Sequence, residues 1–121
     1  MAMGGNHDVA AVICCYTEQR WPEIRSALDS LSGQDHRPAE ILLVVDHNEV
    51  LLRRARRELT GVTVLPNEFA QGLSGARNTA LTRARSDLVA FLDDDAVAEP
   101  DWLDHVALPT VVLVPLATVS L

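Results

Sequence analysis

The sequence predicts an α/β fold in which a mostly parallel sheet of four strands is flanked by helices. Short apolar runs alternate with segments of helical periodicity, which is the arrangement of consecutive βαβ units. The apolar runs are also unbroken, as expected for strands that are covered on both faces. With 121 residues, of which 48% are apolar and 22% charged, the chain is long enough to bury one core. We therefore expect one modest domain.

The strands are predicted from the apolar runs and from the turn residues that bound them. Each run is rich in Val, Ile or Leu and ends at a polar or proline-containing loop, which favours a buried strand over a helix of the same length. The predicted strands are 9–15, 40–46, 62–65 and 88–92.

A first helix is predicted between the first two strands. Ile24, Leu28 and Leu31 fall on one helical face, Pro22 suits a first turn and Gly33 suits the end. The second helix is predicted to run to residue 59 from an N-cap at Asn48. Glu49 with Arg53, and Arg54 with Glu58, form pairs of opposite charge at i, i+4 spacing. This is the pattern of a solvated helix face rather than of a nucleic-acid surface. A third helix is predicted after the loop at residues 67–73, with Ser74 as its N-cap.

Composition excludes several classes of protein. A net charge of −7 argues against general binding to nucleic acid or anionic membrane. The chain contains no lysine, which P-loop proteins and response-regulator receivers need. Cys14 and Cys15 are neighbours in a strand, where they point to opposite faces and do not easily bridge, so a reduced, cytoplasmic setting fits best. Residues 1–8 show no secretory signal and are predicted to be disordered.

Four polar clusters follow the four predicted strands. Right-handed crossovers would bring the loops after all four strands to the same edge of the sheet, where α/β proteins bind ligands. Each cluster also has a purely structural interpretation: Thr17 as a helix cap, Asp46 as an Asx turn and Gly72 as a turn residue. The clusters are Thr17 and Glu18, Asp46 and His47, residues 72–78, and the triplet Asp93, Asp94 and Asp95.

The aspartate triplet favours a metal site. A turn needs only one Asp, and three adjacent acids repel one another, so the excess charge indicates a cation together with the phosphates that it carries. Mg²⁺ is usually held by one or two carboxylates plus substrate phosphates. A solvated acidic turn is the alternative.

These pieces together resemble family 2 glycosyltransferases, which have the GT-A fold, a Rossmann-like nucleotide-binding fold. The matching stretches are "VAAVICCYTEQR", "ALDSLSGQDHRPAEILLVVD", "GLSGARNTAL" and "LVAFLDDDAVAEPDWL", which cover residues 9 to about 103 in the order of the family. The resemblance implies a nucleotide-diphosphate-sugar donor, either a UDP-, GDP- or TDP-sugar, and a divalent cation, Mg²⁺ or Mn²⁺.

The resemblance also implies roles for single residues. The loop at Thr17 and Glu18 would border the nucleotide, Asp46 would accept a hydrogen bond from the base, and the loop at Gly72 would lie beside it. Arg77 would lie near the base or diphosphate. In the acidic motif, the resemblance assigns the ribose to Asp93 and the cation to Asp95, and leaves Asp94 without a role.

The resemblance stops near residue 103. Family members place the general base and the acceptor-binding surface beyond the acidic motif, so we expect no catalytic residue here and cannot name an acceptor. We therefore expect residues 9–105 to form a partial, truncated nucleotide-sugar-binding domain. The tail 106–121 is apolar and uncharged, contains two prolines and is too short to span a bilayer. A changed reading frame, a fragment, or an extra β-rich segment on the sheet would each explain this tail, and truncation is favoured.

Two functions stay open on the sequence. The first is a metal-dependent glycosyltransferase that lacks its acceptor half. The second is a non-catalytic nucleotide-binding or interaction module on the same frame. A dinucleotide oxidoreductase is a weaker rival, because the loop after the first strand contains no glycine.

Overall fold

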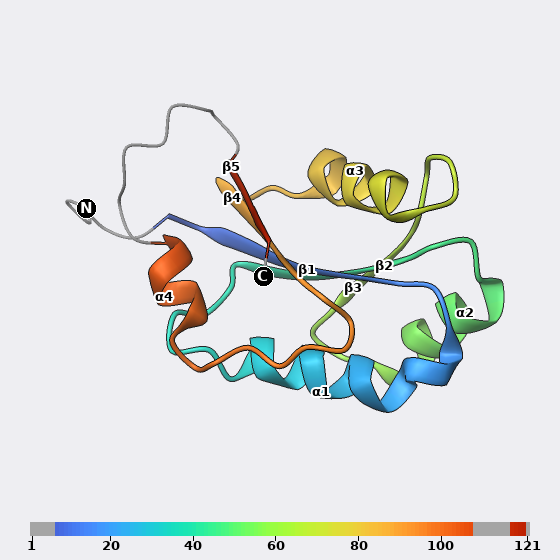
Figure 1. Ribbon diagram of the computed structural model, residues 1–121, viewed down its shortest axis with the longest axis horizontal. Coiled ribbons are helices and arrows are strands. Elements are labelled where there is room, and N and C mark those ends of the chain that lie inside the picture. Colours follow the sequence, from blue (N-terminus) through green and yellow to red (C-terminus); the bar gives the residue numbers. More distant parts are fainter. Residues whose placement is uncertain (1–6, 108–116, 121) are drawn as a thin grey trace.

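The computed structural model describes residues 7–107 and 117–120, which form an α/β sandwich around a parallel sheet (Figure 1). The four predicted strands are confirmed as β1 (Val9–Cys15), β2 (Glu40–Val45), β3 (Thr63–Pro66) and β4 (Leu88–Leu92). Asp46 is therefore the first residue after β2 rather than the last residue of the strand. β3 lies one residue further along the chain than predicted.

The tail contributes a fifth strand that the sequence did not predict. β5 (Ala117–Ser120) pairs in parallel with β4, so the sheet order is β3-β2-β1-β4-β5. This matches the third explanation for the tail, an extra β segment on the sheet. Residues 108–116 and most of the predicted disordered segment 1–8 lie outside the described residues. A last helix, α4 (Trp102–Ala107), crosses the boundary predicted at residue 105.

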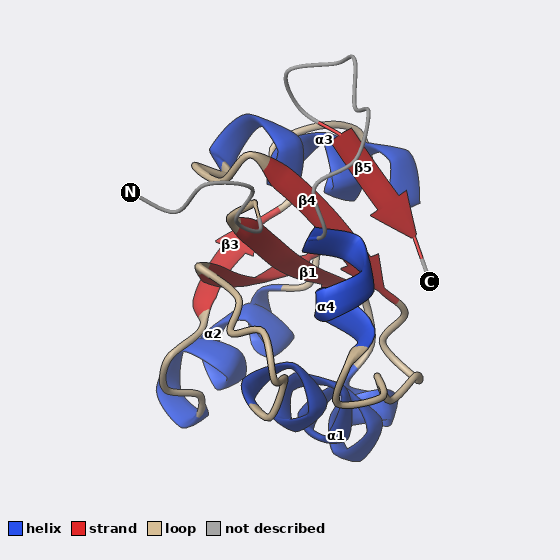
Figure 2. Cartoon of the chain, turned by 90° about the vertical axis from the view of Figure 1, so that its left-hand side faces the viewer, coloured by secondary structure: helices blue, strands red, loops and turns tan. Residues whose placement is uncertain are grey.

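Helices cover the two faces of the sheet unequally. α1 (Trp21–Ser32), α2 (Glu49–Glu58) and α4 lie on one side, and α3 (Leu73–Arg83) lies on the other (Figures 1 and 2). Side chains of β1 alternate between the two cores: Ile13 packs with α1 and α2, whereas Val12 packs with α3. Burial on both faces explains the unbroken apolar sequence of β1, β2 and β4.

Capping and turn residues predicted the ends of α1 and the start of α2 correctly, but not the start of α3. Asn48 caps α2, its side chain accepting from the backbone N–H of Leu51, as predicted. Pro22 lies in the first turn of α1 and Gly33 ends it, also as predicted. The prediction of Ser74 as the N-cap of α3 is wrong. The helix begins at Leu73, two residues earlier than an N-cap at Ser74 would allow, and its N-cap is Gly72, whose φ of 127° is open to glycine alone among common residues.

The strand order creates a switch point between β1 and β4. The chain runs outward from β1 through β2 to β3, and then returns across the opposite face through α3 to place β4 on the other side of β1. Crevices at the carboxyl ends of strands at such a reversal are the usual ligand sites of open α/β sheets.

Candidate functional site

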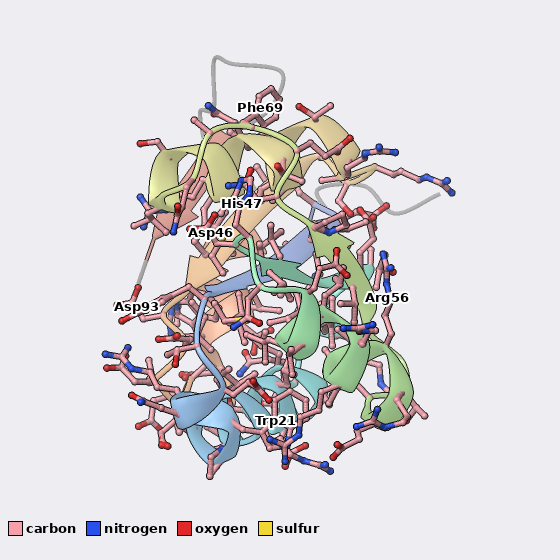
Figure 3. The ribbon with its side chains drawn as sticks, turned by 90° about the vertical axis from the view of Figure 1, so that its right-hand side faces the viewer. Trp21, Asp46, His47, Arg56, Phe69 and Asp93 are labelled. Carbon is pink, nitrogen blue, oxygen red and sulfur yellow. The ribbon has the colours of Figure 1, made fainter. Side chains whose placement is uncertain are left out.

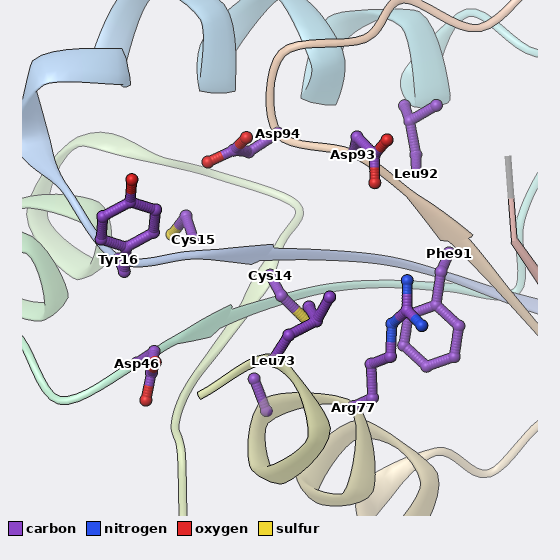
Figure 4. Close-up of a pocket in the computed structure, with 11 residues that line it drawn as sticks. Cys14, Cys15, Tyr16, Asp46, Leu73, Arg77, Phe91, Leu92, Asp93 and Asp94 are labelled. Atoms are coloured by element: carbon purple, nitrogen blue, oxygen red, sulfur yellow. The ribbon is translucent and has the colours of Figure 1, made fainter. Parts of the chain in front are cut away.

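A cavity of about 220 Å³ lies at this switch point, between the carboxyl ends of β1 and β4 and the first turns of α3 (Figure 4). Its floor is apolar and its rim carries three carboxylates and one guanidinium. The lining residues are Cys14, Cys15, Tyr16, Asp46, Leu73, Ala76, Arg77, Phe91, Leu92, Asp93 and Asp94.

The structure brings together some of the residues predicted for the site and leaves others outside the lining. Asp46, Arg77 and Asp93 come from three separate loops and helices and all face the cavity. Two others lie close by but outside it: Gly72 contacts Asp46, and Asp95 lines a neighbouring hollow beside Pro22 and Glu23.

Thr17 and Glu18 do not line the cavity. The Thr17 hydroxyl accepts from the backbone N–H of Gln19 at 3.2 Å and so caps a short 3-10 helix, η1 (Glu18–Arg20). This is the capping role that the sequence left as an alternative. The residue of this loop that faces the cavity is Tyr16, which the sequence analysis missed although it is the single tyrosine of the chain. Tyr16 is 57% exposed, so its ring is open to a ligand at the mouth of the cavity.

Arg77 is a cation without an anionic partner among the described residues. Its guanidinium stacks over the ring of Phe91, 5.2 Å from the centroid, and reaches from α3 towards β4 (Figure 4). Its Nε atom is buried and has no hydrogen-bond partner. A buried N–H donor without a partner costs free energy, so this arrangement favours an anionic or carbonyl-bearing ligand in the cavity.

Asp46 is held firmly by neutral donors. The Asn67 side-chain amide donates to its Oδ1 atom and the backbone N–H of Gly72 donates to its Oδ2 atom, both at 2.9 Å. The Nε2 atom of the neighbouring His47 lies 2.8 Å from the carbonyl oxygen of Phe69. Figure 3 shows the side chains of Asp46, His47 and Phe69 at one edge of the sheet. Each Asp46 oxygen still has lone-pair capacity for one further donor.

The aspartate triplet is divided by burial. Asp94 is only 7% exposed and accepts a hydrogen bond from Arg20 Nη1 at 2.8 Å. Asp93 and Asp95 are both exposed, and Asp95 Oδ2 lies 3.7 Å from the same Arg20 nitrogen. The turn is closed by a hydrogen bond from the Ala96 N–H to the Asp93 carbonyl oxygen. Asp94 is therefore buried with Arg20 as its counter-ion, whereas Asp93 and Asp95 are exposed.

The two cysteines form part of the cavity floor as thiols. Both are free, and burial raises the pKa of each to about 12, with smaller contributions from Asp46 and Asp94 and, for Cys14, an opposing one from Arg77. Neither thiol is a nucleophile at neutral pH, because the thiolate is the reactive form.

No three His, Cys, Asp or Glu side chains within residues 7–107 and 117–120 are grouped closely enough to hold a metal ion by themselves. The donor set at the acidic turn is instead two exposed carboxylates beside a cavity that contains an unpaired guanidinium. Hard oxygen ligands of this kind suit Mg²⁺ or Mn²⁺ when a phosphate supplies further ligands. Among the described helices, none is long and apolar enough to cross a membrane.

The fold and the strand-end cavity define an open α/β protein with a candidate ligand site at its switch point, and comparison with known proteins gives the family. A model of glycosyl transferase family 2 matches residues 10–109, and the chain belongs to that family. The resemblance seen in the sequence is thereby confirmed.

Curated relatives carry the names of glycosyltransferases. The glucosyl-dolichyl phosphate glucuronosyltransferase of Haloferax volcanii is 32% identical over 99 residues, which cover 79% of this chain and 32% of the relative. The pre-mycofactocin glycosyltransferase of Mycobacterium tuberculosis is 31% identical over 119 residues, covering 74% and 25%. The chain thus spans about a third or less of the length of these relatives.

A solved structure confirms the fold. The crystal structure of residues 1–349 of S. aureus TarS superposes with a TM-score of 0.62 at 24% identity, covering 82% of this chain and 31% of that one. The chain therefore has the Rossmann-like GT-A architecture expected from the sequence.

Proposed function

We propose that this chain forms the donor-binding half of a metal-dependent glycosyltransferase, and that the cavity binds the nucleotide diphosphate of a sugar donor. The unpartnered Nε atom of Arg77 carries this proposal, because it is a buried donor without a partner on a cation whose side chain lines the cavity. Guanidinium groups bind phosphate with more than one hydrogen bond, which suits a diphosphate.

The opposite wall of the cavity supports the other parts of a donor. Tyr16 offers an exposed aromatic face on which a nucleobase can stack. Asp46, fixed by Asn67 and Gly72, presents oxygens that can accept from a base N–H. Asp93 lies on the same rim at the end of β4, within the lining of the cavity, and we assign the ribose hydroxyls to it.

We assign the divalent cation to Asp95, with the phosphates of the donor as its other ligands. A bound Mg²⁺ or Mn²⁺ stabilises the negative charge of a departing nucleoside diphosphate as a Lewis acid. Asp95 lies outside the cavity lining but is exposed and belongs to the same turn as Asp93, so its carboxylate is available to a ligand at the rim. We assign no catalytic base to this chain. We also propose no acceptor, because this chain spans only about a third or less of the length of these relatives.

Calorimetric titration tests the donor site. UDP, GDP and TDP are titrated with and without Mn²⁺, and one of them is expected to bind at least tenfold more tightly with the metal. The Asp95→Asn variant should lose most of that metal-dependent gain while keeping its stability. Asp29→Asn is the matched control, because it removes the same charge from an exposed position on α1.

Equal affinity with and without Mn²⁺ would overturn the proposal. That result would instead favour a non-catalytic module, in which the same α/β frame binds a nucleotide without a metal or serves as an interaction surface.

A further inference from the structure

The acidic turn contains a pairing that donor binding by itself does not explain. Of the three adjacent aspartates, the central one, Asp94, is buried, and its partner, Arg20, lies 74 positions away in the sequence. An isolated buried carboxylate is costly, so the burial of Asp94 depends on this cation.

Arg20 is fixed at the junction of two helical segments. It is the last residue of η1 and precedes the first residue of α1, Trp21, which is anchored in the core. Thr17 closes η1 on the other side through its side chain and its carbonyl oxygen. The guanidinium therefore extends from a backbone that is held at both ends, which lowers the entropy cost of pairing with Asp94.

The segment that follows the acidic turn is anchored to α1. The backbone N–H of Ala98 donates to the Ser30 hydroxyl of α1 at 3.0 Å, which ties the segment after the triplet to α1. Arg20 and Ser30 thus hold the turn at two points. Arg77 cannot replace Arg20, because it lies on α3 on the other side of the sheet, over Phe91.

We infer that Arg20 is a positioning residue that retains Asp94 as its own partner and so leaves Asp93 and Asp95 as the acids that meet the donor and its cation. This inference rests on the donor site proposed above. Three free carboxylates in a row would repel one another and offer competing ligands for the metal. Pairing the central acid with Arg20 offsets one negative charge of the turn, although Asp94 still borders the cavity, and leaves the carboxylates of Asp93 and Asp95 exposed.

The distances give this arrangement a specific consequence. The Arg20 nitrogen lies 2.8 Å from Asp94 Oδ1 and 3.7 Å from Asp95 Oδ2, so Asp95 is the nearest alternative partner. If Asp94 loses its charge, Arg20 is free to pair with Asp95, and it then competes with the cation for that carboxylate. Asp94 therefore protects the metal ligand without itself binding metal.

Two single variants and their combination test the inference through Mn²⁺ binding, measured by electron paramagnetic resonance with the nucleotide selected above. Asp94→Asn is expected to weaken Mn²⁺ binding about tenfold, because it releases Arg20 towards Asp95. The double variant Arg20→Gln/Asp94→Asn is expected to recover most of that loss, since no competing cation remains. Arg25→Gln/Asp94→Asn is the control and should not recover it, because Arg25 pairs with Glu58 of α2 and not with the acidic turn.

Thermal unfolding without any ligand provides an independent readout. Arg20→Gln is expected to lower the melting temperature by about 4 °C, and adding Asp94→Asn to it should cause little further loss, because the pair acts as a unit. Arg20→Lys should retain part of the stability.

The outcomes separate the two proposals. If no nucleotide binds with Mn²⁺, the proposed donor site is wrong. Mn²⁺ binding without nucleotide, and the thermal unfolding of the single and double variants, then still test the role of Arg20. Failure of the double variant to recover Mn²⁺ affinity would show that Asp94 is itself a ligand and would overturn the inference. Additive thermal shifts for Arg20→Gln and Asp94→Asn would overturn it as well.

Discussion

The two polar loops that border the cavity are held in opposite ways. The segment from Asn67 to Gly72 is fixed by a dense set of hydrogen bonds that converge on Asn67 and Asp46, together with an ion pair between Glu68 and Arg83. The acidic turn at Asp93–Asp95 has fewer anchors, chiefly the Arg20–Asp94 ion pair and the hydrogen bond from Ala98 to Ser30, and it leaves two carboxylates exposed. The first loop thus shapes a rigid wall, and the second keeps charge available for a ligand. In the proposed donor site, donor recognition would need the first property and metal binding the second.

Asn67 is the centre of the rigid wall. Its amide nitrogen donates to Asp46 and to the Ala70 carbonyl oxygen, while its Oδ1 atom accepts from the Phe69 N–H and the Thr79 hydroxyl. Asn67 and Thr79 are both buried, and removing the amide takes one hydrogen bond from each of these four groups. Asp46 keeps its bond to Gly72, and Thr79 keeps its bonds to Glu68 and Gly75.

The largest effect is expected for the substitution Asn67→Ala, which removes the centre of the hydrogen-bond network in the first loop. We expect it to lower the free energy of unfolding by about 3 kcal/mol, because the buried amide and its hydrogen bonds to four groups are lost at once. Urea denaturation measures the change. Asn78→Ala, at an exposed position on α3, is the control and should change stability by less than about 0.5 kcal/mol. Equal effects of the two variants would show that the network is not what holds this loop.

A second, somewhat smaller effect is expected at Gly75, where α3 passes under the same loop. A Cβ atom at this position would lie within 2.2 Å of the Ala70 carbonyl oxygen, so Gly75→Ala forces the backbone apart. We expect a loss of about 2 kcal/mol in urea denaturation. Gly33→Ala is the matched control, because its Cβ would meet the Asp29 carbonyl oxygen at 3.5 Å, an ordinary contact. Similar losses for the two variants would contradict the crowding argument.

The effect that is smallest at neutral pH, and that grows only in alkaline solution, concerns the cysteines on the cavity floor. Burial raises the pKa of Cys14 and Cys15 from 9.0 in the unfolded chain to about 12. Between these values the unfolded state binds fewer protons than the folded state, so stability falls as pH rises above about 9. The loss should be on the order of 1 kcal/mol per pH unit for each thiol, after allowance for partial exposure of Cys14.

Denaturation from pH 8 to 11 measures this dependence, and the chain suits the experiment because it contains no lysine that would titrate in the same range. A variant with both cysteines replaced by alanine is expected to show a flatter profile. An equally steep profile in that variant would mean that other groups, not the thiols, cause the alkaline loss.

Much of the fold could be predicted because its signals are local. Unbroken apolar runs marked β1 and β4 to the residue, and Asn48 and Gly33 marked helix ends through their own backbone and side-chain chemistry. The start of α3 was misplaced because two candidates, Gly72 and Ser74, lie within one turn. The contact between Gly72 and Asp46, which favours the earlier start, joins residues 26 positions apart and is not visible in the local sequence.

The candidate site could be predicted in outline only. Asp46, Arg77 and Asp93 were expected to converge, and they do, because parallel strands end at the same edge. Thr17 and Glu18 were assigned to the site by their place after β1, but the chain turns there, so that Tyr16 faces the cavity and Thr17 caps η1. Sequence position identified the right loop and not the right side chain.

The sequence by itself determined the strands, the family and the loops that carry polar groups, because burial periodicity, capping and motif spacing are written in neighbouring residues. Only the tertiary structure decided which charges are paired and which are left for a ligand. Arg20 and Asp94 meet because β4 lies next to β1 in the sheet, although they are 74 positions apart along the chain. The energy of such a pair depends on distance and burial, and both of these arise only when the strands are assembled.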